Sequence, residues 1–107
     1  FDHAEKPRLQ KDLGSKNAIS LRNHGTLTLG DTVAAAFARM YFLERACTMQ
    51  VRTLSQCTEG RSLHPTEESV LAKNVMIGSM GVASASQFLI WPALLRKLEK
   101  LDPTYKD

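Results

Sequence analysis

Only two short stretches of this sequence alternate between apolar and polar residues as the strands of a half-buried sheet do. The first is 17–23, in which Ile19 and Leu21 share one face, and the second is 26–29, T-L-T-L. Two strands do not form a stable sheet by themselves, and a hairpin with an apolar face needs neighbours that cover it. We therefore expect part of the sheet to lie outside these 107 residues.

The loop of the hairpin decides which residues face each other. A two-residue loop at His24 and Gly25 would pair Leu21 with Thr28 and so place a leucine and a threonine on one face. A loop one residue longer pairs Leu21 with Leu29 and leaves Gly25 free to take a positive φ. We predict the three-residue loop, which places His24 at the tip of the hairpin, clear of the core.

Helices are predicted on both sides of the hairpin. A short one covers 4–13 and ends at Gly14. A long one is capped by Asp31 or Thr32 and extends to about Cys57. Its apolar residues recur at steps of three and four and form one stripe: Val33, Phe37, Met40, Tyr41, Cys47, Val51 and Leu54.

A third helix is predicted to start at Pro65, with two carboxylates at 67–68 in its first turn, where the helix dipole favours them. Its inward residues are expected to be Val70, Leu71, Val75 and Met76. Gly78 and Gly81 loosen it before a last segment, in which Pro92 either kinks a helix or starts one. The apolar face of that segment holds Phe88, Trp91, Leu95 and Leu98.

Composition limits the class of protein. Fourteen Lys and Arg against 11 Asp and Glu give a net charge of +3, but the charges are scattered, so we predict no nucleic-acid partner. The longest uncharged stretch, 74–95, is interrupted by polar residues, glycines and a proline, so we predict no membrane span. Cys47 and Cys57 lie ten residues apart on one predicted helix, about 15 Å along its axis, which is too far for a disulfide. This predicts a reduced, cytoplasmic protein.

Most familiar catalytic motifs are missing. His3, His24 and His64 are too far apart to form an H-x-H or H-E-x-x-H element, and no serine stands in G-x-S-x-G. His24 remains, because a neutral imidazole on a rigid hairpin is a good ligand for a divalent transition metal. A histidine in a turn is more often a residue that merely tolerates the left-handed conformation. Glu44, beside the apolar stripe, is expected to be a flanking carboxylate paired with a neighbouring arginine.

Longer runs of the sequence resemble a known family. The run L-R-N-H-G-T-L-T-L-G at 21–30, followed by D-T-V-A-A-A-F-A-R-M-Y-F-L-E-R-A-C at 31–47, closely resembles the C-terminal portion of the class II aldolase/adducin domain. D-L-G-S-K-N at 12–17 and W-P-A-L-L-R-K-L-E-K-L-D-P-T-Y at 91–105 resemble its bacterial members. The resemblance implies an α/β fold, in which residues 1–107 form the C-terminal part of one three-layer domain, with one β-hairpin and about four helices. The start at Phe1, with no Met, also suggests a piece of a longer protein.

The resemblance implies a metal site that this chain contributes to but does not complete. In sugar-phosphate aldolases of the family, a divalent metal, usually zinc, is held by an H-x-H element and by the histidine of R-N-H-G, which here is His24. The H-x-H pair, a catalytic glutamate and the phosphate-binding loops belong to the N-terminal half, so this chain alone is not expected to be active. A tyrosine near the C-terminus of a neighbouring subunit can assist catalysis, and Tyr105 is its candidate counterpart.

Two functions follow from the resemblance. The first is a metal-dependent lyase that reversibly cleaves an aldol bond in a sugar-phosphate-type substrate. The second is an adducin-like module that self-associates and binds proteins without metal or turnover. Both imply assembly, either as a homo-oligomer, with a tetramer as the aldolase arrangement, or with the missing N-terminal half. An upstream H-x-H element or metal in the full-length protein would separate the two.

Overall fold

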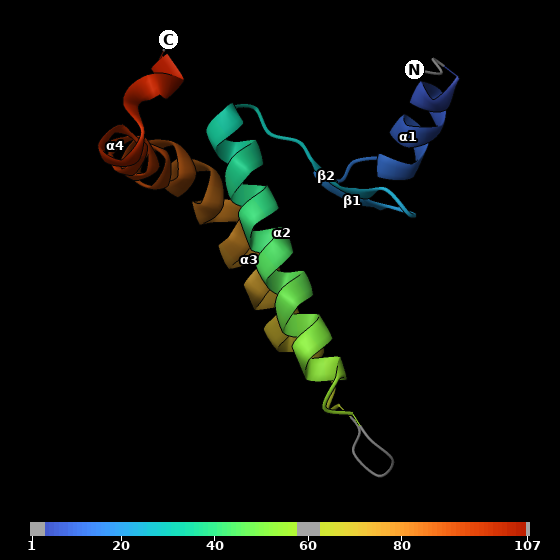
Figure 1. The fold of residues 1–107 in the computed structure, drawn as a ribbon. Helices are drawn as coiled ribbons and strands as arrows, with labels where there is room; N and C mark the ends of the chain where they lie inside the picture. The colour runs from blue at the N-terminus through green and yellow to red at the C-terminus, as the bar shows by residue number, and fades with distance from the viewer. Residues whose placement is uncertain (1–3, 58–62, 107) are drawn as a thin grey trace.

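The computed structural model of the protein describes residues 4–57 and 63–106 (Figure 1). Within these residues it has one hairpin and four α-helices: α1 (Glu5–Leu13), β1 (Ala18–Leu21), β2 (Gly25–Thr28), α2 (Val33–Leu54), α3 (Glu68–Ala85) and α4 (Trp91–Leu101). A π-helical segment, η1 (Ser86–Ile90), joins α3 to α4, and a 3-10 turn, η2 (Pro103–Lys106), follows α4. The predicted α/β class, with one hairpin and four helices, is confirmed.

The helices α2 and α3 lie side by side, and the other elements gather near the start of α2 (Figure 1). There, α1 and the hairpin are on one side of α2, and α4 and the C-terminal turn are on the other. Among the described residues, no helix has both the length and the apolar content needed to cross a membrane.

The hairpin pairs in a different register from the predicted one. β1 and β2 are antiparallel, with Ile19 opposite Leu27 and Leu21 opposite Gly25. The predicted pairing of Leu21 with Leu29 is therefore wrong. The loop has three residues, as predicted, but it lies earlier in the chain, at 22–24. Ile19 and Leu21 do share the more buried face of β1, as predicted.

Asn23 explains the earlier turn. It has a φ of +56°, in the left-handed region, which asparagine tolerates better than most residues. The chain therefore reverses directly after Leu21, whose carbonyl oxygen accepts a hydrogen bond from the His24 backbone amide at 3.2 Å. Gly25 also has the positive φ expected of it, +149°, but at the start of β2.

Local sequence signals predict the end of α1 and the start of α2 correctly. Gly14 ends α1 with a φ of +57°. Thr32, and not Asp31, caps α2, because its hydroxyl accepts a hydrogen bond from the Ala35 amide at 3.1 Å. The helix ends a little before Cys57, the predicted limit.

The third helix begins later than predicted and is more regular. It starts at Glu68 rather than at Pro65, because the carbonyl of Glu67 is the acceptor for the first amides, those of Val70 and Leu71 at 3.0 and 3.1 Å. Glu68 is in the first turn, as predicted.

Beyond this start, α3 continues through Gly78 and Gly81, so the loosening predicted at these two glycines is wrong. The irregular turn falls at η1 instead. Pro92 is in the first turn of α4, directly after this π-helical segment, so it lies at the start of α4. The Trp91 ring meets the Phe37 ring edge-on, with 5.6 Å between centroids, and joins the start of α4 to α2.

The core of the chain is small. The buried apolar residues among those described are Ala34, Ala35 and Ala38 of α2. Val75 of α3, which was predicted to point inward, is 72% exposed, and Val33, from the apolar stripe of α2, is 73% exposed. The rest of that prediction for α3 is also wrong, since its other members are exposed as well: Val70, Leu71 and Met76. The radius of gyration is 17.7 Å, against about 13 Å for a compact domain of this length, so large apolar faces of α2 and α3 are uncovered.

Candidate functional site

The candidate metal ligand, His24, is in the loop between β1 and β2, and its side chain is exposed. Asn23 in the left-handed conformation and the bond from the His24 amide to Leu21 set the direction of the loop. The imidazole is therefore at the end of a short, hydrogen-bonded hairpin and is open to a ligand. It is not wedged among aliphatic side chains, an arrangement that would have argued against metal binding.

Three hydrogen bonds attach β2 and the residue after it to α2, and we call them the β2–α2 clamp. Thr28 Oγ1 donates to the Ala36 carbonyl at 3.0 Å. Arg39 Nη1 donates to the Leu29 carbonyl at 2.5 Å. The third bond is donated by the Thr26 hydroxyl to Glu44. Because the clamp holds β2 at several points along its length, it limits how far the hairpin can swing on α2.

Thr26 Oγ1 has two acceptors on α2. Glu44 Oε1 is 3.2 Å away and Met40 Sδ is 3.3 Å away. A hydroxyl has one proton to donate, and a carboxylate oxygen is the stronger acceptor, so we assign the bond to Glu44. Thr26 is two positions along the chain from His24, which makes this the clamp bond nearest to the candidate ligand in sequence.

The predicted pairing of Glu44 with an arginine is wrong. Within the described parts of the chain, no arginine lies at ion-pair distance from Glu44. The two arginines near it in sequence are engaged elsewhere, Arg39 on the Leu29 carbonyl and Arg45 over the Tyr41 ring, 5.3 Å from its centroid. The Glu44 carboxylate instead accepts the clamp bond from Thr26 and so helps to attach the hairpin to α2.

Gly30 allows the chain to pass close to the start of α2. A Cβ built on Gly30 would be 2.5 Å from the Ala36 amide nitrogen and 3.0 Å from the Thr32 carbonyl oxygen. Only glycine fits such an approach of backbone to backbone. Just before it, the Leu29 amide donates to the Asn17 carbonyl at 2.9 Å and extends the hairpin pairing.

The residues that the structure describes do not make a complete metal site. No group of three or more His, Cys, Asp or Glu residues in 4–57 and 63–106 is arranged to hold an ion. His64 is exposed in the segment before α3, and His3 lies outside the described residues. Within the described residues, His24 is therefore a candidate for a single ligand of a transition metal.

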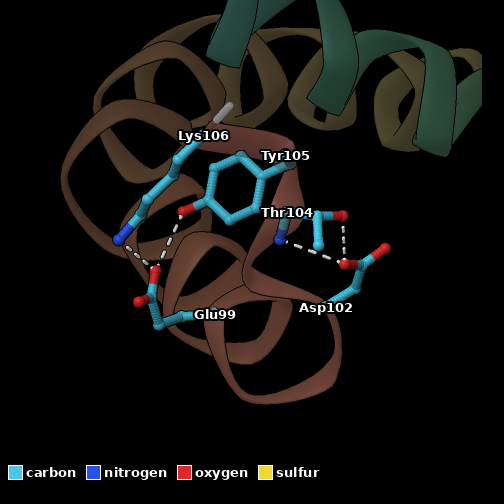
Figure 2. A network of polar contacts seen from close by, with 5 residues as sticks. All are labelled: Glu99, Asp102, Thr104, Tyr105 and Lys106. Atoms are coloured by element: carbon cyan, nitrogen blue, oxygen red, sulfur yellow. Dashed lines mark hydrogen bonds and ion pairs between the residues drawn. The ribbon is translucent and has the colours of Figure 1, made fainter.

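Tyr105, the other predicted site residue, is in η2 and is 44% exposed. Its hydroxyl donates to Glu99 Oε2 at 3.3 Å, and Lys106 forms an ion pair with the same oxygen (Figure 2). The C-terminal turn and the hairpin are on opposite sides of α2 (Figure 1), so one chain does not bring Tyr105 and His24 together. Any joint role requires Tyr105 of another subunit.

Sequence reasoning missed the β2–α2 clamp. The signal for Thr26 and Thr28 was their spacing on the polar face of a strand followed closely by a helix, since threonines there can reach the helix. No local signal marks Arg39, whose partner is a backbone carbonyl ten residues away in sequence.

Comparisons with known proteins agree with this geometry. The model of the Class II Aldolase and Adducin N-terminal domain matches residues 2–51, which include the hairpin and most of α2. Over these residues the chain is similar to the class II aldolase and adducin family.

Individual relatives extend the match to the whole chain. A Pseudomonas aeruginosa protein named "Putative aldolase class 2 protein" is 40% identical over 99% of this chain and 41% of its own length. The crystal structure of an aldolase II superfamily protein from Pseudomonas syringae covers 99% of this chain and 41% of its own, with a TM-score of 0.82 and 34% identity. Human beta-adducin is 47% identical over 49% of this chain and 7% of its own length. The chain thus spans about two fifths of the length of the bacterial relatives that it matches.

Proposed function

We propose that this chain is part of a metal-dependent lyase of the class II aldolase type, and that His24 is one ligand of its divalent metal, zinc by preference. The observation that carries the proposal is the exposed His24 imidazole at the end of a hairpin that the clamp fixes to α2. Neutral imidazole is the commonest protein ligand for such metals. The family relatives named as class 2 aldolases support the choice of reaction.

The proposed reaction is reversible aldol cleavage of a sugar-phosphate-type substrate. A bound divalent metal would polarise the substrate carbonyl and stabilise the negative charge that develops during cleavage. His24 would contribute one nitrogen lone pair and would not transfer a proton. The clamp would hold the direction of that lone pair, because it attaches β2 to α2 on the C-terminal side of the loop.

The other ligands would come from polypeptide outside these residues. We propose that the chain acts together with the N-terminal half of the domain and within a homo-oligomer, a tetramer in the aldolase arrangement. In that assembly, Tyr105 would assist the site of a neighbouring subunit. Cys47 and Cys57 are free thiols, which supports the proposal of a reducing, cytoplasmic location.

Activity of the full-length protein tests the proposal. A panel of ketose and aldose phosphates is offered, and the aldehyde released is measured with a coupled dehydrogenase. We expect cleavage that a chelator abolishes and added zinc restores, that His24→Ala removes, and that the exposed-histidine control His64→Ala leaves intact. Cleavage that survives both the chelator and His24→Ala would contradict the proposal.

A second function is favoured by the match to a protein named beta-adducin, which is 47% identical over 49% of this chain. In this alternative, the fold serves as a non-catalytic module that self-associates and binds other proteins. It predicts an oligomer in analytical ultracentrifugation that contains no metal, shows no turnover and is unaffected by His24→Ala.

A further inference from the structure

The surface formed by α4 and η2 is recessed and strongly basic. An open recess of about 640 Å³ has three cations on its wall, Arg96, Lys97 and Lys100, together with one carboxylate, Glu99, and Tyr105. We call it the α4 recess. The helix α4 and the turn η2 that form it are on the opposite side of α2 from the hairpin (Figure 1). Of the residues on its wall, the proposed lyase uses only Tyr105 and none of the cations.

The three cations share one face of α4. Lys100 follows Arg96 by four positions and Lys97 by three, and residues at these spacings are neighbours on a helix. Like charges at such spacings repel each other. Among the described residues, no carboxylate forms an ion pair with any of the three.

The two carboxylates in this part of the chain are occupied by other groups (Figure 2). Glu99 accepts the Tyr105 hydroxyl and forms an ion pair with Lys106. Asp102 accepts from the Thr104 hydroxyl at 2.5 Å and from the Thr104 amide at 3.1 Å. The positive charge of the recess is therefore left for a ligand to neutralise.

We propose that the α4 recess binds a small phosphate monoester. The forked guanidinium of Arg96 and the ammonium groups of Lys97 and Lys100 match the oxygens of a phosphate dianion. Leu95, also on the recess wall, and the Tyr105 ring offer apolar surface to the organic part of the ligand. The volume is within the range of small-molecule sites.

Binding is tested by titration calorimetry on the full-length protein, with inorganic phosphate and phenyl phosphate as probes and with sodium chloride keeping the ionic strength constant. We expect both probes to bind, phenyl phosphate more tightly, because only it can use the apolar wall. Arg96→Gln and Lys100→Gln should each weaken binding about fivefold, the value of one charge-assisted contact at an exposed site.

Matched controls separate a site from a general effect of charge. Lys73→Gln removes one exposed cation from α3 and should leave both affinities unchanged. His24→Ala should also leave binding at the recess unchanged, which keeps this test independent of the lyase proposal. Circular dichroism verifies that each variant keeps its helix content.

Three results would overturn the assignment. They are no binding of either probe at millimolar concentration, equal weakening by Lys73→Gln and Lys100→Gln, and displacement of phosphate by chloride at constant ionic strength. The last two would mean that only a diffuse ion atmosphere surrounds the basic surface.

Discussion

Replacing Thr28 with valine should loosen the attachment of the hairpin to α2. The substitution keeps the β-branched shape that suits a strand but removes the hydroxyl that donates to the Ala36 carbonyl at 3.0 Å. A single hydrogen bond of this kind has a net value of about 1 kcal/mol. The loss should not be greater, because a carbonyl inside a helix also has an amide partner of its own and is not left unpaired.

The backbone amide of Leu29 reports this change directly, because it donates to the Asn17 carbonyl and exchanges with solvent only when the hairpin opens. A loss of about 1 kcal/mol corresponds to roughly fivefold faster exchange of this amide in native-state hydrogen exchange. The matched control is Thr53→Val, since the Thr53 hydroxyl donates to a carbonyl of its own helix. Two results would refute the role given to the clamp. In the first, the exchange rate of the Leu29 amide in Thr28→Val stays within about twofold of wild type. In the second, Thr53→Val accelerates this exchange as much as Thr28→Val does.

Further substitutions test other parts of the fold. Gly30→Ala should destabilise the protein by about 2 kcal/mol or more in urea unfolding, because its Cβ would be 2.5 Å from the Ala36 amide nitrogen; an unchanged midpoint would contradict the close approach. Thr32→Ala should cost about 1 kcal/mol by the same assay, while Thr32→Asp retains most of the cap; equal losses would refute the capping bond. The hydroxyl and amide of Thr104 lower the pKa of Asp102 below 3.8, so its carboxylate stabilises the fold above that value and loses this effect as the pH falls through the lower pKa of the folded state. Asp102→Asn should therefore reduce the acid sensitivity of the melting temperature, and identical pH profiles would count against it.

Features that depend on a few neighbouring residues could be predicted from the sequence. Gly14 at the end of α1, Thr32 as one of two candidate caps for α2 and Pro92 at the start of α4 each act within one helical turn. The position of His24 in the loop of the hairpin was also predictable, because the alternation of residue types brackets it on both sides.

The register of the hairpin was not predictable in this way. The prediction matched the apolar faces of the two strands and so paired Leu21 with Leu29, but the backbone preference of Asn23 decided the turn. Matching of faces is a weak guide when the apolar residues of the strands are only partly covered. In this structure even Leu29 is 44% exposed.

Contacts between residues far apart in the sequence could not be predicted either. Glu44 was expected to pair with a neighbouring arginine, whereas its partner is Thr26, eighteen residues away in sequence. The same limit applies to burial. Periodicity identifies the apolar stripe of α2, but which of its residues are covered depends on neighbours, and here the covered ones are the small Ala34, Ala35 and Ala38.

The central claim, that the His24 imidazole is a metal ligand completed by groups from outside these residues, is tested most directly by counting metal. The full-length protein, His24→Ala and His64→Ala are purified in parallel and analysed by inductively coupled plasma mass spectrometry. We expect one divalent metal per subunit in the wild type and in His64→Ala, and a loss of most of it in His24→Ala. Equal metal content in all three proteins, or none in the wild type after exposure to zinc, would contradict it.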